Sequence, residues 1–285
     1  MSIFTSLRNL AKKLSHIFTK KDDLKIPYLK SYVINSDDNE INEKTRQEVR
    51  QILYTRHNEV MDKTLHEYFI NNKTNAIHKW FMYFDVYERH FARFRGKDVS
   101  ILEIGVQNGG SARMWKHYFS KDGAKVDIYG VDLDPRCKGV ETDGFKVFIG
   151  SQEDRGFWQD LRAQIPRVDI LIDDGGHTMR QQIITFEEMF DFVKDDGLYL
   201  CEDLHTSYWW GWGGGFGRGV SFIDYTKRLI DALNAYHATN SDDLQVSKFT
   251  NSAYSITYYD SIIVIEKRQK DRRNLAGAYI GKSML

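Results

Sequence analysis

The stretch Val168-Asp-Ile-Leu-Ile-Asp173-Asp174-Gly-Gly-His177 places a short apolar run directly before two carboxylates, two glycines and an imidazole. The apolar half predicts a buried strand over 168–172, because short apolar runs bounded by turn residues are typical of fully covered strands. A second stretch repeats the pattern, with the apolar run 198–201 leading into Glu202-Asp203-Leu-His205. Ligands of open α/β sheets bind outside the carboxyl ends of the strands. The two stretches therefore predict acidic side chains gathered at one edge of a sheet.

Strands and helices alternate on both sides of this point. Apolar strands are predicted at 99–103, 126–131, 145–149, 168–172 and 198–201, with helices between them, such as 181–193. Alternation of this kind predicts an α/β fold with a doubly wound, mostly parallel, Rossmann-like sheet. Two last strands, 254–258 and 262–267, flank Tyr259-Asp-Ser261 and predict a C-terminal antiparallel hairpin at the sheet edge.

Composition divides the chain into four segments. Residues 1–45 are predicted to form a basic amphipathic helix, over 1–21, and a polar linker. Its basic face suits an anionic membrane surface, and its apolar stripe suits packing on protein. Residues 46–97 form a helical, aromatic cover segment, residues 98–270 the α/β domain, and residues 271–285 a tail. The cover segment and the first helix are the predicted contacts of a homo-oligomer.

Charge and cysteine content exclude several classes. Lys plus Arg and Asp plus Glu number 40 each, so the basic excess of a nucleic-acid-binding protein is missing. No apolar run is long enough to span a membrane. Arg8, Lys12 and Lys13 interrupt any secretory signal. Cys137 and Cys201 fit neither a disulfide framework nor a zinc pattern. These features predict a cytoplasmic protein, with peripheral contact at the inner membrane face as the alternative.

A glycine turn follows the first strand. Its pattern, Glu103-Ile-Gly105-Val-Gln-Asn-Gly109, departs from the G-x-G-x-x-G of dinucleotide folds. The carboxylate of Glu103 would repel a phosphate and attract an amine. Asp132 ends the second strand, where a carboxylate accepts hydrogen bonds from ribose hydroxyls. Gln152 and Asp154 follow the third strand and are predicted adenine contacts, although Asp154 suits a helix N-cap equally well. A cationic ligand with a ribose and no phosphate indicates S-adenosylmethionine.

Several motifs together carry a family resemblance. They are Tyr87-Glu-Arg-His-Phe91, Leu102-Glu-Ile-Gly-Val106 through Gly109-Gly-Ser-Ala-Arg-Met-Trp115, Ile128-Tyr-Gly-Val-Asp132, Ile172-Asp-Asp-Gly-Gly-His177 and Glu202-Asp-Leu-His-Thr-Ser-Tyr-Trp209. Through them the chain resembles the class I S-adenosylmethionine-dependent methyltransferases. Within these it resembles the metal-dependent sugar O-methyltransferases of the mycinamicin 2''-O-methyltransferase type. The resemblance covers roughly residues 75–210 and leaves the first 70 residues without a match.

The resemblance implies a magnesium site and a general base. By position, Asp174, Glu202 and Asp203 correspond to the metal ligands and His177 to the base. Oxygen ligands suit Mg²⁺, and they suit Mn²⁺ as well. A neutral imidazole near pH 7 can take the proton of a hydroxyl that attacks the methyl group.

Two further residues of the acidic stretches each have two possible roles. Asp173 contacts the cofactor's cationic side or only caps the turn after its strand. His205 has a catalytic or supporting role or a hydrogen bond within its own loop. The loop at 208–219, rich in tryptophan and glycine, predicts a mobile lid that stacks on sugar rings, with a packed aromatic loop as the alternative.

Together these features predict an enzyme that O-methylates a sugar hydroxyl with S-adenosylmethionine and Mg²⁺. The acceptor is a surface polysaccharide or a natural-product glycoside. One alternative keeps the fold and the methyl donor and changes the acceptor to a catechol or small phenol. Another is a non-catalytic scaffold on the same fold, which clustered buried charge disfavours.

Overall fold

The computed structural model describes residues 39–55, 64–240, 242–270, 277 and 280–281. The predicted helix at 1–21 and most of the predicted tail lie outside the described residues. The chain forms two compact units, Met1–Tyr54 and Thr55–Leu285. Helix α2 spans Asn39–Thr55 and belongs to the first unit up to Tyr54. The last residues of the predicted linker are therefore helical.

The described part of the second unit holds one seven-stranded sheet with the order β3-β2-β1-β4-β5-β7-β6. Strands β1 to β5 are parallel, and β7 runs antiparallel to both β5 and β6. This confirms the predicted doubly wound sheet and its hairpin edge. The strands are β1 Val99–Ile104, β2 Val126–Asp132, β3 Phe145–Ile149, β4 Val168–Asp173, β5 Val193–Cys201, β6 Ala253–Tyr259 and β7 Ile262–Lys267.

Strand β5 begins at Val193, five positions before the apolar run that predicts it. The prediction starts late because residues 194–196 are charged. Val193 pairs with Val168, and the register then shifts before Ile170 pairs with Leu198. The residues between include the exposed Asp195. A hydrophobic pattern cannot detect the part of a strand whose side chains face water, as they do at the N-terminal end of β5.

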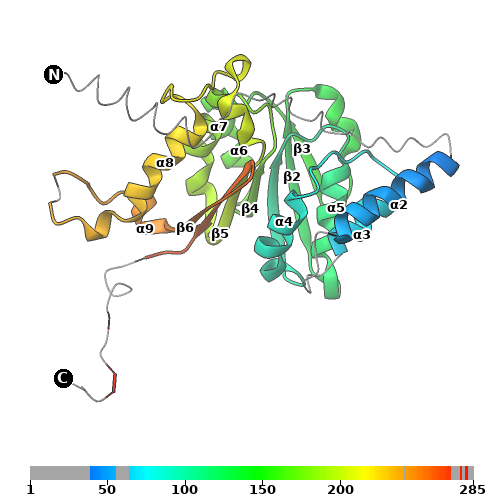
Figure 1. Ribbon diagram of the computed structural model, residues 1–285, viewed down its shortest axis with the longest axis horizontal. Coiled ribbons are helices and arrows are strands. Elements are labelled where there is room, and N and C mark those ends of the chain that lie inside the picture. The colour runs from blue at the N-terminus through cyan, green and yellow to red at the C-terminus, as the bar shows by residue number, and fades with distance from the viewer. Residues whose placement is uncertain (1–38, 56–63, 241, 271–276, 278–279, 282–285) are drawn as a thin grey trace, which may run out of the picture. The chain divides into compact units, whose positions relative to one another are not determined.

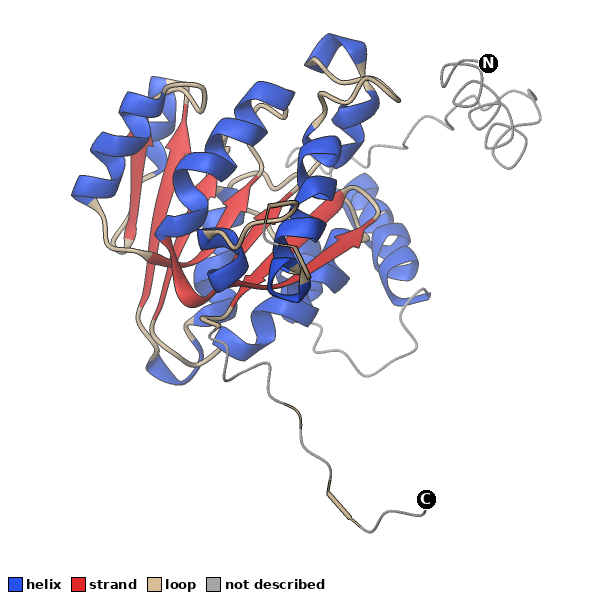
Figure 2. Cartoon of the chain, turned by 90° about the vertical axis from the view of Figure 1, so that its left-hand side faces the viewer, coloured by secondary structure: helices blue, strands red, loops and turns tan. Residues whose placement is uncertain are grey.

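Helices cover both faces of the sheet. Figure 1 shows α6, α7 and α8 on one side of it and α4 and α5 on the other, and Figure 2 shows the strands behind the first of these layers. The helices of this unit are α3 Thr64–Asn71, α4 Tyr83–Phe91, α5 Gly110–Phe119, α6 Arg155–Gln164, α7 Met179–Met189, α8 Phe222–Leu233 and α9 Lys248–Ser252. Short 3₁₀ helices are η1 Ala92–Phe94, η2 Lys121–Gly123, η3 Pro135–Val140, η4 Phe190–Phe192, η5 Leu204–Tyr208, η6 Trp210–Trp212 and η7 Ala235–His237.

The hydrophobic core lies on both faces of the sheet and includes large aromatic side chains. On one face, Trp158 and Met189 pack against the sheet. On the other, Tyr87 of α4 meets Trp115 of α5 edge to face at 5.0 Å between ring centroids. Cys201 is a buried free thiol within β5. Among the described residues, no helix has both the length and the apolar character needed to cross a membrane.

Candidate functional site

The glycine turn after β1 and the acidic turn after β4 touch each other. The backbone N–H of Asp174 donates to the carbonyl of Ile104 at 3.0 Å. Gly105 has a φ of +91°, and a Cβ there would lie 2.0 Å from the carbonyl oxygen of Asp174. Only glycine allows this approach. The sheet therefore brings the predicted cofactor turn and the first acidic cluster to one place.

Three predicted site residues converge at this edge. One ligand atom each from Asp174, His177 and Asp203 lies within 4.8 Å of the others. His177 Nε2 is 3.5 Å from Asp203 Oδ2 and 3.8 Å from Asp174 Oδ1. The hydroxyl oxygen of Thr206 lies 2.9 Å from the carbonyl oxygens of both His177 and Asp203, so its single O–H is shared between them and links the two loops. The arrangement suits a hard cation beside an imidazole.

The backbone at two of these residues is strained. His177 has a φ of +58° and Asp203 a φ of +55°, in the left-handed region that favours glycine. Such conformations persist only where the surroundings enforce them, and they concentrate at functional sites. His177 Nδ1 is also buried without a hydrogen-bond partner among the described residues. An unsatisfied polar atom at this position is what a site completed by a ligand is expected to show.

A lysine that the sequence did not single out lies within the cluster. Lys79 Nζ is 2.5 Å from Asp174 Oδ2 and 2.9 Å from both carboxylate oxygens of Glu202. Burial opposes its charge, yet the neighbouring carboxylates of Asp174 and Glu202 raise the pKa of Lys79 above its ordinary value. It therefore stays cationic. No motif or spacing marks Lys79, which lies far from both acidic stretches in sequence.

Glu202 faces the protein interior. Its side chain is 1% exposed and accepts a hydrogen bond from the Tyr87 hydroxyl at 2.6 Å as well as from Lys79. Burial, and then the charge of Asp174, raise the pKa of Glu202. The Tyr83 hydroxyl in turn donates to Asp203 Oδ1 at 2.6 Å. Helix α4 thus lies over the acidic edge and fixes two of its carboxylates.

Asp173 and Gln152 form buried hydrogen bonds that hold the turn after β4. Asp173 is fully buried and accepts hydrogen bonds from Gln152 Nε2 at 2.7 Å and from the Tyr199 hydroxyl at 3.3 Å. Burial raises the pKa of Asp173 to about 6. Gln152 also donates to Thr185 and accepts from the backbone N–H of Gly176. Both side chains are thus occupied by the protein, and their predicted cofactor contacts stay predictions.

Glu103 and Asp154 likewise have partners inside the chain. Glu103 is buried and accepts hydrogen bonds at 2.9 Å from the Ser111 hydroxyl and the Trp115 indole of α5. Burial raises the pKa of Glu103. Asp154 caps α6 by accepting from the backbone N–H of Gly156 at 2.8 Å, which is the alternative weighed for it. A direct cofactor role for either residue stays a prediction.

Asp132 lies at the open end of β2. Its Oδ2 accepts from the backbone N–H groups of Val106 and Gln107 at 2.9 and 3.0 Å, and its Oδ1 accepts from Asp134 N–H at 2.9 Å. A carboxylate has about four acceptor positions, so capacity remains for a ligand hydroxyl. The next residue, Leu133, is 70% exposed and offers an apolar surface there. Gly109, with a φ of +69°, is the N-cap residue that directly precedes α5.

His205 is held within its own loop. Its Nδ1 is 2.7 Å from the Ser261 hydroxyl, and its ring stacks on Trp80 with 4.8 Å between centroids. Burial lowers the pKa of His205. It does not join the Asp174, His177 and Asp203 group. These contacts match the local alternative considered for it, and a catalytic role stays a prediction.

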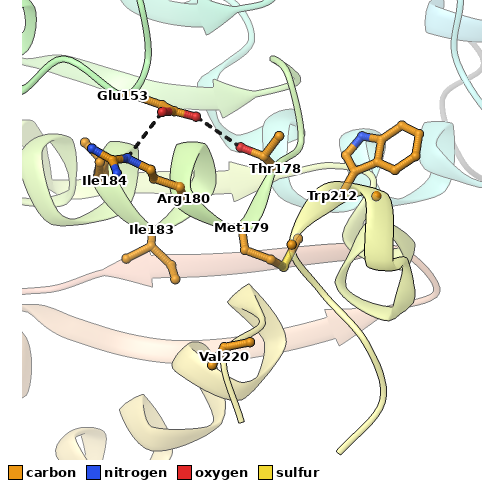
Figure 3. A pocket seen from close by; sticks show the side chains of 10 residues that line it. Glu153, Thr178, Met179, Arg180, Ile183, Ile184, Trp212 and Val220 are labelled. Atoms are coloured by element: carbon orange, nitrogen blue, oxygen red, sulfur yellow. Dashed lines mark hydrogen bonds and ion pairs between the residues drawn. The ribbon is translucent and has the colours of Figure 1, made fainter. Parts of the chain in front are cut away.

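A cavity of about 540 Å³ is lined in part by Thr178, the residue that follows His177. Figure 3 shows Met179 and Trp212 at its wall, with Glu153 bridging Arg180 and Thr178 at one side. The loop that supplies Trp212 also carries Trp210 and Phe216, which are 74% and 90% exposed. These aromatic faces are too exposed to form a core.

No family model matches the chain. The demethylmacrocin O-methyltransferase of Streptomyces fradiae is 31% identical over 219 residues, which are 73% of this chain and 53% of the relative. The mycinamicin VI 2''-O-methyltransferase of Micromonospora griseorubida is 31% identical over 196 residues, which are 65% and 48%. The chain spans about half the length of the curated relatives it matches.

Solved structures also show similarity to an O-methyltransferase of the mycinamicin type. The MycE methyltransferase of the mycinamycin biosynthetic pathway, solved with Mg and SAH, matches with a TM-score of 0.64 and 28% identity, over 81% of this chain and 60% of that one. The same enzyme with Mg, SAH and mycinamycin VI matches with a TM-score of 0.63. The chain has the class I methyltransferase fold and resembles the metal-dependent sugar O-methyltransferases of the mycinamicin type.

Proposed function

We propose that this protein transfers a methyl group from S-adenosylmethionine to a sugar hydroxyl with the help of a divalent cation. The observation that carries the proposal is the convergence of Asp174, His177 and Asp203 beside the glycine turn of β1. The similarity to sugar O-methyltransferases, one of them solved with Mg and SAH, supports it.

The residues at the ends of β1 and β2 fit the methyl donor. Asp132 retains acceptor capacity for a ribose hydroxyl, and the exposed Leu133 suits an apolar base. Gly105 and Gly109, the first and last residues of the turn, carry no side chain, so the backbone is accessible to a ligand at these two positions. Buried carboxylates on the adjacent turn favour a cationic ligand over a phosphate.

The carboxylates at the ends of β4 and β5 fit a hard cation. Asp174 and Asp203 each direct an oxygen toward the same small space. Mg²⁺ takes oxygen ligands and is usually held by one or two carboxylates with several waters. Bound there, it would orient the acceptor and lower the pKa of its hydroxyl.

His177 is the proposed general base. Its Nε2 lies 3.8 Å from Asp174 Oδ1 and 3.5 Å from Asp203 Oδ2, and it would take the hydroxyl proton as the oxygen attacks the methyl carbon and the carbon–sulfur bond breaks. The cavity beside Trp212 and the exposed aromatic loop supply flat faces on which a sugar ring can stack. A catechol acceptor remains the second candidate, because two adjacent hydroxyls would meet the same carboxylate site.

Chelation provides the first test of this proposal. Adding EDTA is expected to slow methyl transfer to a sugar acceptor at least tenfold, and Mg²⁺ is expected to restore it, because the cation positions and acidifies the hydroxyl. The measurement is S-adenosylhomocysteine release with a panel of sugar and catechol acceptors. Full activity in EDTA would remove the metal from the proposal, and turnover of catechols alone would select the second candidate.

Cofactor binding is tested separately by thermal unfolding. S-adenosylhomocysteine at 100 times its dissociation constant is expected to stabilise the fold by about 2.7 kcal/mol and raise the midpoint by roughly 5–10 °C. NADH serves as the control and is expected to leave the midpoint unchanged. If neither compound shifts the midpoint, the scaffold alternative takes the place of the enzyme.

A cytoplasmic location, homo-oligomeric assembly and membrane contact through residues 1–21 stay predictions from sequence.

A further inference from the structure

The two edges of the sheet are protected differently. At the β3 edge, the backbone N–H of Val147 donates to the carboxylate of Glu141 at 2.8 Å. Thr142 and Phe145 also exchange two backbone hydrogen bonds, of 3.1 and 2.9 Å. Lys146, within the strand, is exposed. A covering turn and an exposed lysine both keep an edge strand from pairing with another chain.

The β6 edge has neither form of protection. In the described part of the chain, the backbone of β6 pairs only with β7. The strand, Ala253-Tyr-Ser-Ile-Thr-Tyr-Tyr259, contains no charged residue and no proline. Its pairing with β7 is irregular between Ala253 and Ser255 and regular from Ser255 to Tyr259. An uncharged, regular edge of this kind is a template for a further strand.

We propose that β6 pairs edge to edge with β6 of a second copy of this chain, antiparallel and about a twofold axis at Thr257. The edge of an antiparallel strand is complementary to itself under a twofold rotation, so both copies use the same surface. An axis at Thr257 pairs all five regular residues. Thr257 then faces Thr257 of the second copy, and Ile256 faces Tyr258. Threonine pairs and aromatic pairs with β-branched residues are both favourable across strands.

The charges beside β6 fit the same arrangement. The Arg268 guanidinium lies over the ring of Tyr254, 3.6 Å from its centroid, at the N-terminal end of the strand. The exposed Asp260 follows the C-terminal end. An axis at Thr257 places Tyr254 opposite Asp260 of the second copy, so Arg268 of each copy approaches an opposite charge. Complementary charge of this kind fixes the register of an interface, and it favours a second copy over an unrelated peptide.

Disulfide trapping of the full-length protein tests this register. Thr257→Cys is expected to form a covalent dimer on oxidation, because directly opposite Cβ atoms lie about 4.5–5.5 Å apart, close to disulfide reach. The native thiols of Cys137 and Cys201 are buried. The matched control is Ser255→Cys, whose two copies would lie about 13 Å apart along the strands. It is expected to cross-link at least about tenfold more slowly. Equal rates in the two variants, or no dimer with Thr257→Cys, would overturn the proposal.

Sedimentation of the full-length protein provides the second test. Wild type is expected to dimerise, and Thr257→Lys is expected to weaken the dimer at least about tenfold, because like charges then meet at the axis. Thr257→Glu should do the same, and mixing the two variants should restore the dimer. Val246→Lys, at an exposed position outside β6, is the control and should leave the dimer intact.

Three outcomes of the sedimentation experiment would refute the proposal. A monomeric wild type would do so directly. An oligomer that survives both Thr257 variants would place the contact elsewhere, such as residues 1–21 or 46–97. A monomer whose amides at 255–259 are protected from hydrogen exchange would place a segment of the same chain on the β6 edge.

Discussion

Replacement of His177 by alanine is expected to lower kcat for methyl transfer by about 10²–10⁴-fold, the usual contribution of a positioned general base. His177 Nε2 lies 3.5 Å from Asp203 Oδ2, at the space where the acceptor hydroxyl would bind beside the cation. Without the imidazole, the hydroxyl proton must go to water while the oxygen attacks. Because the cofactor turn does not include this side chain, S-adenosylhomocysteine should still raise the melting temperature of the variant.

The matched control for this variant is His205→Ala. His205 is also a half-buried histidine at this edge, but its ring is engaged by Ser261 and Trp80. Its loss is expected to change kcat by less than about tenfold, well below the contribution of a general base. A His177→Ala enzyme within a few-fold of wild type would exclude the base. A rise in its Kd for Mn²⁺ that parallels the loss of turnover would instead make His177 a metal ligand.

The sheet and its acidic edge were predictable because they rest on patterns local in sequence. Apolar runs that end in glycine and carboxylates define both a strand and the point where it stops, as at Asp173 and Glu202. Parallel connection then places successive strand ends at one edge. The convergence of Asp174 and Asp203 follows from these two steps.

The partners of those carboxylates were not predictable in the same way. Lys79, Tyr83 and Tyr87 reach the acidic edge from a segment far away in the chain. Their aromatic pattern indicates burial but not which hydroxyl meets which carboxylate. Gln152 and Asp173 show the converse limit, since residues at the end of a strand face either the ligand or the protein, and these two face each other.

Replacement of Gly105 by alanine is expected to damage both the fold and the site. The φ of +91° alone costs an L-residue about 1–2 kcal/mol. The added methyl group would also lie 2.0 Å from the backbone oxygen of Asp174, which is not a flexible side chain that can move aside. The free energy of unfolding should therefore fall by more than about 4 kcal/mol, the range reached only by severe steric or polar defects.

Gly123→Ala separates the two causes. Gly123 has a φ of +81°, close to that of Gly105, but a Cβ there meets nothing within 4 Å. This variant should lose only the conformational cost of about 1–2 kcal/mol in urea unfolding and should keep the wild-type Kd for Mn²⁺. Gly105→Ala should weaken Mn²⁺ binding as well, because relief of the clash must move Asp174. Equal losses of stability in the two variants, with Mn²⁺ binding intact in both, would show that the β1 turn and the metal site are independent. The expected difference would show instead that the glycine turn serves the metal site as much as the methyl donor, since one backbone contact sets the position of both.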